Sequence, residues 1–391
     1  GLDDLWVKRG TRTDLPVSFR KYALEAFLDW RDPSPLDRVL NDYRPLPQGR
    51  PVGDFATSLA AVLPSLMKEE LLQSLAIKLS GAFKAQGVAP QLVATLQNAQ
   101  ANEELRTQSL IALTDLNADN LKGLLLDAAD DKNGQVRLTA RTMLTKHFSE
   151  AAIDSLVAGL DAELIAERQS AIQALAKLKA PRAGEVLLKW VNRLGTDEAP
   201  VELQLELIEV ASSRDDERFR EALAKYEATR KADDPLANYR ECLAGGDAVR
   251  GESIVWGRSD ASCRRCHKVN DNGGEVGPDL TTIGKEKTRE YLLESIVHPN
   301  AQIAKGFETT MIFTDRGRSI VGIVKSETDT ELTLMKADGE VISIAKESID
   351  ERTTGQSAMP ELVKFLSKRD LRDVVEYLSS LKEPAKPESH P

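Results

Sequence analysis

The chain has 391 residues, of which 41% are hydrophobic and 29% are charged, a composition ordinary for a globular protein of two or three domains. Its 52 basic and 62 acidic residues give a net charge of −10, which argues against nucleic acid or an anionic lipid surface as the main partner. Uninterrupted apolar runs such as 59–63 are far shorter than the roughly 20 residues that span a bilayer, so we expect no transmembrane segment.

The first 57 residues are predicted to hold one amphipathic helix and a proline-rich strap. The helix runs from Phe19 to Trp30, because apolar side chains recur there at helical spacing. It ends in the segment 31–35, where prolines push the preceding residues out of the helical conformation. Further prolines up to about Gly53 predict an extended segment without regular structure.

Residues 58–232 are rich in Ala and Leu at helical spacing. Two residue types repeat there with a period of 31, an arginine and a leucine seven positions after it. The repeated positions are Arg106, Arg137, Arg168, Leu113, Leu144 and Leu175. Such self-similarity predicts a helical solenoid that resembles HEAT repeats, although its period is shorter than the roughly 40 residues usual for that class. We expect the arginines to form salt bridges between repeats rather than a binding strip.

The segment Cys263-Arg264-Arg265-Cys266-His267 holds two of the three cysteines and one of the four histidines. Two thiols three positions apart, followed at once by an imidazole, form the C-x-x-C-H pattern of covalent haem c attachment. On one helical turn the two sulfurs can bond the porphyrin vinyl groups while the histidine binds the iron. A redox-active dithiol, half of a zinc site and chance are the alternatives. Cys242 stands apart and is expected to be a small packed side chain.

A Gly-Pro element follows this motif at Gly277-Pro278-Asp279-Leu280, which begins ten residues after His267. Small c-type cytochromes carry such an element where the chain passes beside the proximal imidazole. The carbonyl of Pro278 can then accept the Nδ1 hydrogen of His267, which would orient the ring and tune the iron. An ordinary turn is the alternative.

The sixth iron ligand has to come from further along the chain. The candidates are Met311, Met335, Met359 and His298. The first two methionines lie in alternating, strand-like runs, where methionine is normally a packing residue. The histidine ends a predicted helix, 289–297, which is an ordinary place for a solvated histidine. Met359 lies in a loop of small residues and is therefore the preferred distal ligand, with His298 or an open position as alternatives.

Residues 305–350 are predicted to form a small antiparallel sheet or barrel, inserted before the Met359 loop. Runs of alternating polarity and short turns indicate four strands. These strands are Thr309–Thr314, Ser319–Ser326, Glu331–Lys336 and Glu340–Ala345. A closing amphipathic helix is predicted from Lys368 to Leu381.

Residues 246–381 resemble the planctomycete-type cytochrome c domain. The resemblance is carried by the segments 263–267, 277–280, 291–296, 306–309 and 357–360. In that family the domain commonly closes large secreted proteins that begin with a β-propeller of the sugar-dehydrogenase kind and continue with helical repeats. The resemblance implies one haem on Cys263 and Cys266, with His267 as proximal and Met359 as distal ligand. His298 departs from the pattern, in which an acidic or polar residue is expected, and this keeps a bis-histidine state open.

These features predict a mainly α chain with four parts. We expect a helix plus proline-rich strap at 1–57 and HEAT-like helical repeats at 58–232. A class I-like cytochrome c domain at 245–382 would carry the β insertion at about 305–350, and a flexible tail would occupy 383–391.

The expected function is electron transfer by a single haem c, from a dehydrogenase module, separate or missing, to another carrier. A haem enzyme with an open sixth position, peroxidase-like, is one alternative, and an assembly scaffold with a structural haem is another. Covalent haem implies a periplasmic or secreted protein. The chain opens at Gly1 with neither an initiator Met nor a signal peptide, so we expect a processed form or a piece of a longer protein.

Overall fold

A computed structural model describes residues 9–28, 34, 42–43 and 55–384. Most of the described chain is helical, with one five-stranded antiparallel sheet and a two-stranded hairpin, so the expected mainly α class is confirmed. The chain divides into two compact units, Gly1–Gly184 and Glu185–Pro391. Within the described ranges every helix is too short or too polar to span a bilayer. Trp30, most of the expected proline-rich strap and most of the expected tail lie outside those ranges.

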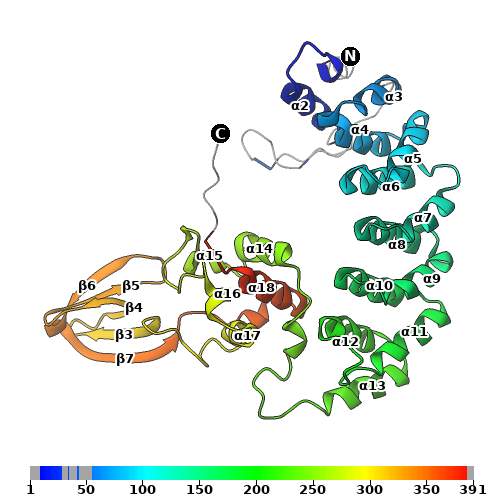
Figure 1. Cartoon of the computed structure of the whole chain (residues 1–391). Coiled ribbons are helices and arrows are strands. Elements are labelled where there is room, and N and C mark those ends of the chain that lie inside the picture. Colours follow the sequence, from blue (N-terminus) through cyan, green and yellow to red (C-terminus); the bar gives the residue numbers. More distant parts are fainter. Residues whose placement is uncertain (1–8, 29–33, 35–41, 44–54, 385–391) are drawn as a thin grey trace. The chain divides into compact units, whose positions relative to one another are not determined.

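The first unit consists of short helices, most of which pack against neighbours close to them along the chain (Figure 1). They are α2 (Val17–Leu28), α3 (Phe55–Leu66), α4 (Glu70–Ala82), α5 (Ala89–Gln97), α6 (Glu103–Leu116), α7 (Leu121–Ala129), α8 (Gly134–His147), α9 (Ser149–Gly159) and α10 (Ile165–Lys177). α11 (Pro181–Val191) crosses into the second unit. Helix α6 packs on α4, α8 on α6, and α10 on α8, so the even-numbered helices follow one another in a row.

The 31-residue period corresponds to equivalent positions in this row. Leu113, Leu144 and Leu175 have exposed fractions of 0% and lie in α6, α8 and α10. Arg106 pairs with Asp131, at 3.1 Å between Nη1 and Oδ1, and Arg137 pairs with Glu167, at 2.9 Å between Nε and Oε2. The expected salt bridging between repeats is thus confirmed for these two arginines. Arg168 donates its Nε hydrogen to the carbonyl of Leu160.

The second unit contains the C-x-x-C-H segment. Its helices are α12 (Gln204–Ser213), α13 (Glu217–Glu227), α14 (Ala248–Gly257), α15 (Cys263–Cys266), α16 (Ile283–Glu286), α17 (Arg289–Val297) and α18 (Lys368–Ser380). Helices α14 and α18 cross at very close range (Figure 1). A Cβ atom on Gly251 would lie 2.0 Å from the carbonyl oxygen of Asp373, so only glycine allows this approach. The indole Nε1 of Trp256 donates to the hydroxyl of Tyr377, at 3.1 Å, across the same crossing.

A buried set of charges joins α12 to α18. The guanidinium of Arg372 makes two hydrogen bonds of 2.9 Å to the carboxylate of Glu206, and both side chains are almost fully buried. Arg369, one turn earlier on α18, bonds Glu209 at 2.9 and 3.0 Å. Bidentate arginine–carboxylate pairs fix orientation as well as distance, so α12 packs as part of the same body as α18.

The sheet has the strand order β6-β5-β4-β3-β7. Its strands are β3 (Glu308–Thr314), β4 (Ser319–Glu327), β5 (Glu331–Met335), β6 (Val341–Ala345) and β7 (Ile349–Ser357), while β1 (Lys268–Val269) and β2 (Asn272–Gly273) form the hairpin. The four expected strands are confirmed, and β7 was not predicted. One face of the sheet buries its own apolar cluster around Ile312, Leu332 and Leu334.

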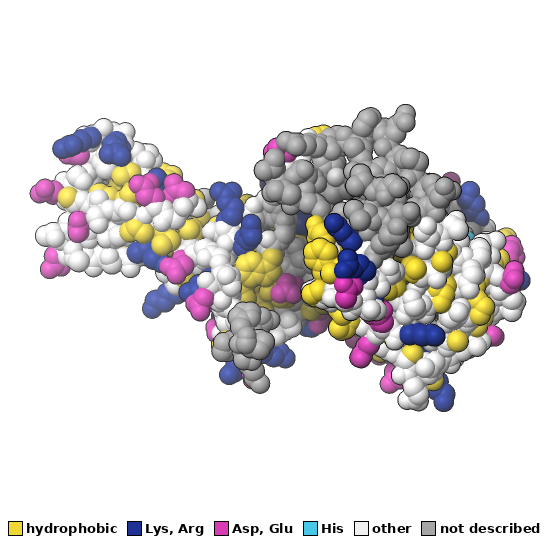
Figure 2. Space-filling view, turned by 90° about the horizontal axis from the view of Figure 1, so that it is seen from above, with side chains coloured by type: hydrophobic (Ala, Val, Ile, Leu, Met, Phe, Trp, Pro, Cys, Tyr) yellow, Lys and Arg dark blue, Asp and Glu magenta, His cyan; other side chains and the backbone are white. Residues whose placement is uncertain are grey.

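The other face of the sheet is apolar as well. Ile323 and Met335 pair directly on β4 and β5, and both pack with Val276, Phe307 and Cys266. Figure 2 shows hydrophobic patches between charged groups on the lobe of the sheet. On the face that carries Ile323 and Met335, further apolar side chains are exposed. They include Met311, Phe313, Val321 and Val341. The inserted sheet therefore contacts the C-x-x-C-H segment through one strip of its outer face.

Candidate functional site

The two cysteines and the histidine of the motif lie on one helical turn and the residue that follows it. Helix α15 begins at Cys263 and ends at Cys266, and the amide of His267 donates to the carbonyl of Cys263 at 2.9 Å. Cys263 packs against the main core of the second unit, whereas Cys266 packs against the cluster of Val276, Ile323 and Met335. Both thiols are free and only partly buried. The turn thus carries two separate, reduced sulfurs and one imidazole.

The imidazole of His267 is oriented by the Gly-Pro element. Its Nδ1 lies 2.9 Å from the carbonyl oxygen of Pro278. A carbonyl can only accept, so Nδ1 carries the hydrogen and Nε2 keeps its lone pair. Burial lowers the pKa of His267, and the hydrogen bond to Pro278 opposes this only in part. The ring is therefore neutral near pH 7, and Nε2 has no hydrogen-bond partner among the described residues.

Glycines let the following loop close around the motif. A Cβ atom on Gly277 would lie 2.7 Å from Cε1 of His267, so the backbone passes directly against the ring. The amide of Gly277 donates to the carbonyl of Cys266 at 2.7 Å, and that of Gly274 donates to the carbonyl of Arg264 at 2.9 Å. These bonds satisfy carbonyls of a helix too short to do so internally. The loop leaves little freedom for the ring to turn.

The surroundings of the two thiols in this segment favour the protonated form. Burial raises the pKa of Cys263 and of Cys266, and the positive charge of Arg265 offsets only part of this effect for Cys266. Redox-active C-x-x-C pairs instead have a thiol whose pKa is lowered, because the thiolate is the nucleophile. Burial also raises the pKa of Cys242 to about 12, and this side chain is fully buried in the main core, as expected for a packing residue.

The candidate sixth ligands lie in different surroundings. Met359 follows β7 closely, is partly buried, and packs against the main core to which Cys263 also belongs. Met335 lies in the cluster beside Cys266, and Met311 is exposed. The ring of His298 is exposed, and its Nε2 lies 3.0 Å from the carbonyl oxygen of Pro235. Each cysteine thus has one methionine in its own cluster.

The packing of Cys266 against the cluster that contains Met335 was not foreseen from the sequence. A signal for it existed, because β4 carries apolar residues on both faces, Ile320 and Val324 on one and Val321 and Ile323 on the other. A strand of a sheet with only one covered face alternates apolar and polar residues. Apolar residues on both faces indicate that a second part of the chain covers the sheet.

These residues fit a covalently bound haem. Two thiols for the covalent bonds to the porphyrin and a neutral imidazole with a free Nε2 for the iron are the protein groups that haem c requires. The ring is packed against Gly277, and the Pro278 carbonyl is the outer partner that metal-bound histidines usually have. Among the described residues no group of three or more His, Cys, Asp and Glu side chains could hold a metal ion.

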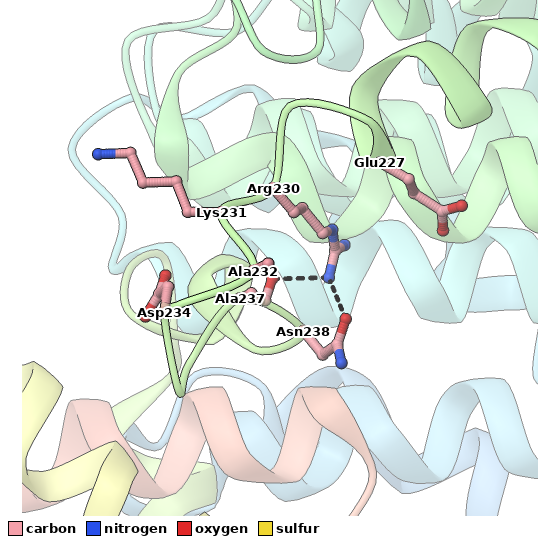
Figure 3. Close-up of a pocket in the computed structure, with 7 residues that line it drawn as sticks. All are labelled: Glu227, Arg230, Lys231, Ala232, Asp234, Ala237 and Asn238. Carbon is pink, nitrogen blue, oxygen red and sulfur yellow. Dashed lines mark hydrogen bonds between the residues drawn. The ribbon is translucent and has the colours of Figure 1, made fainter.

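A separate concave site lies in the connection after α13. This cavity, of about 450 Å³, is lined by polar side chains, and Figure 3 shows Arg230 pointing to Ala237 and Asn238. Nη1 of Arg230 donates to the Ala237 carbonyl at 2.7 Å and to the Asn238 side chain at 3.2 Å. Its basic side chains, Arg230 and Lys231, are balanced by Glu227 and Asp234. The guanidinium of Arg230 therefore stabilises the connecting segment after α13.

No protein-family model matches the chain, and a search of curated proteins finds no match.

Proposed function

We propose that the chain is a single-haem c-type cytochrome that transfers electrons. Haem would be attached through Cys263 and Cys266 in a class I-like cytochrome c domain, preceded by HEAT-like solenoid repeats. The observation that carries the proposal is the hydrogen bond of His267 Nδ1 to the Pro278 carbonyl, which leaves a neutral Nε2 free beside two reduced thiols. That arrangement supplies every protein group that haem c needs on its proximal side.

The side chains would divide the work of holding the cofactor. The two thiols would tether it, and His267 and Met359 would be the iron ligands. Bound haem supplies a reversible one-electron iron couple, and a His/Met pair raises its reduction potential. Cys263 and Met359 are partly buried against the main core. This apolar surrounding would limit the access of water to a bound haem and so favour its reduced state.

The direction of electron flow follows from this ligation. A raised potential suits a carrier that accepts electrons from a dehydrogenase module and passes them to another redox protein. Covalent haem assigns the protein to the periplasm or the secreted space. A redox dithiol is less well supported, because burial raises the pKa of both thiols.

The first test replaces the cysteines. Cys263→Ala with Cys266→Ala should abolish covalent haem, measured by the intact mass and the reduced spectrum of protein made with a cytochrome c maturation system. Cys242→Ala is the matched control, because that thiol is buried elsewhere in the core, and it should keep one haem. Haem that remains bound covalently in the double variant would overturn the proposal.

The second test identifies the distal ligand. Met359→Ala should remove the sulfur-to-iron absorption band of the oxidised protein, whereas Met335→Ala and Met311→Ala should keep it. Loss of the band only in Met335→Ala would assign the iron to the methionine beside Cys266 instead. A wild-type protein that lacks the band and binds peroxide or cyanide readily would favour an enzyme with an open sixth position.

A further inference from the structure

A groove of about 790 Å³ lies next to the C-x-x-C-H turn, on the side that carries the two arginines between the cysteines. It is lined by Arg264 and Arg265 from α15, by Trp256 and Glu252 from α14, and by Tyr377 from α18. Neither cysteine, nor His267 or Met359, is among its lining residues. The groove is therefore a separate feature from the site described above.

The side chains of both arginines that line this groove are exposed and available to bind a ligand. Neither guanidinium has an ion pair or a side-chain hydrogen bond to any residue that the structure describes. Their backbone is held, however, because Gly274 donates to the carbonyl of Arg264 and packs against that of Arg265. Two free guanidinium groups on a fixed turn keep ten N–H hydrogens, five on each group, for a ligand.

The floor of the groove adds another donor. The hydroxyl of Tyr377 accepts the Trp256 indole hydrogen at 3.1 Å, and its own hydrogen has no acceptor among the described residues. Glu252 is the only acidic residue among those that line the groove. Donors thus outnumber charged acceptors, so the groove suits a ligand rich in negatively charged oxygen atoms.

We propose that this groove binds an acidic segment of a partner protein through its carboxylates. Tryptophan, tyrosine and arginine are the residues that dominate protein–protein binding energy, and here they surround one concavity. The arginines would hold carboxylates in paired hydrogen bonds, and the aromatic rings would cover the stem of the bound side chain. The partner would then lie beside the turn that carries both cysteines. The inference does not depend on haem, because the groove belongs to the polypeptide.

The test measures binding of N-acetylated hexaglutamate amide to the full chain by calorimetry, with the hexaglutamine peptide as the uncharged reference. We expect hexaglutamate alone to bind, and Arg264→Gln with Arg265→Gln to weaken it by about tenfold or more. The matched control is Arg316→Gln with Arg318→Gln, which removes the same charge from the exposed turn between β3 and β4. This control should bind within about twofold of wild type, and added salt should weaken wild type more than the Arg264/Arg265 variant.

Three outcomes would overturn the proposal. Equal loss in both double variants would mean general electrostatic attraction, and equal binding in all three proteins would place the peptide elsewhere. Citrate or inorganic phosphate that binds as tightly as the peptide, with the same dependence on Arg264 and Arg265, would assign the groove to small anions. Haem content can be measured on the same samples, and it bears on the proposed function alone.

Discussion

Gly277 is the residue on which the orientation of the imidazole depends most directly. Gly277→Ala would place a methyl group 2.7 Å from Cε1 of His267, so the ring or the loop must move and the bond to Pro278 must weaken. We expect the free energy of unfolding to fall by about 1–3 kcal/mol, measured by urea denaturation. Gly257→Ala is the control, because nothing lies within 4 Å of its added Cβ, and it should be neutral or slightly stabilising.

Asp373 is a buried carboxyl whose charge is poorly compensated. Its Oδ1 accepts the Asp247 amide at 2.9 Å, Oδ2 has no hydrogen-bond partner, and the Arg250 guanidinium lies 3.4 Å away. Burial raises its pKa, because the charged form is disfavoured there. The folded chain therefore holds this proton more tightly than the unfolded chain, and the stability it contributes at low pH is lost as the pH rises through the folded pKa.

Asp373→Asn removes this titration and keeps an oxygen for the Asp247 amide. The stability of the variant relative to wild type should increase as the pH rises from about 4 toward 7, by at most about 1.4 kcal/mol per pH unit. Urea unfolding at several pH values measures it. Asp260→Asn should show the opposite trend, and only below about pH 4, since Arg258 lowers the pKa of that carboxyl below its ordinary value. A parallel pH dependence of wild type and Asp373→Asn would contradict the assignment.

The proximal half of the candidate site was predictable because it is local in sequence. Spacing alone predicts that Cys263, Cys266 and His267 share a turn, and a proline eleven residues on can reach the ring, as the distance to Pro278 confirms. The neighbours of Cys266 were not predictable in this way. Met335 is far along the chain, and its contact depends on how the sheet packs, which no local pattern specifies.

At the scale of elements, β7 shows what polarity patterns miss. Four strands were predicted from alternation, but β7 is polar along almost its whole length and exposed at every residue from Asp350 to Gln356. It is an edge strand held by its backbone ladder to β3, so its side chains carry no burial signal. Its existence also shortens the loop before Met359, which begins only after Ser357.

The pairing of α12 with α18 predicts a large cost for removing one buried charge. Glu206→Gln would leave Arg372 buried with a neutral partner, and Arg369 would lose its 3.2 Å contact to the same carboxylate. We expect the variant to be about 3–5 kcal/mol less stable by denaturant unfolding. Glu185→Gln, in the exposed pair with Arg218, should change stability by less than about 1 kcal/mol. Equal effects of both changes would show that the buried pair has no special role.

At the scale of the whole molecule, the unit that holds the C-x-x-C-H segment includes residues well before it. Helices α12 and α13 lie in that unit, and the main core includes Leu236 and Cys242, both fully or almost fully buried. Glu241, also buried, pairs with Arg230 and with Lys368 at the start of α18. The helix that closes the core therefore depends on residues 236–242, which lie between the expected end of the repeats at 232 and the expected start of the cytochrome c domain at 245.

This dependence can be tested by comparing fragments 181–391 and 245–391. The shorter fragment loses Leu236, Cys242, Glu206 and Glu241, and full burial of one leucine is worth about 1.5–3 kcal/mol. We therefore expect 245–391 to be at least about 3 kcal/mol less stable in urea than 181–391. The longer fragment should unfold in one transition. Its midpoint, measured by far-ultraviolet circular dichroism, should equal the midpoint at which this unit unfolds in the full chain. Equal midpoints for the two fragments would mean that α18 needs no support from α12. The ion pairs between these helices would then contribute nothing measurable to the stability of the core.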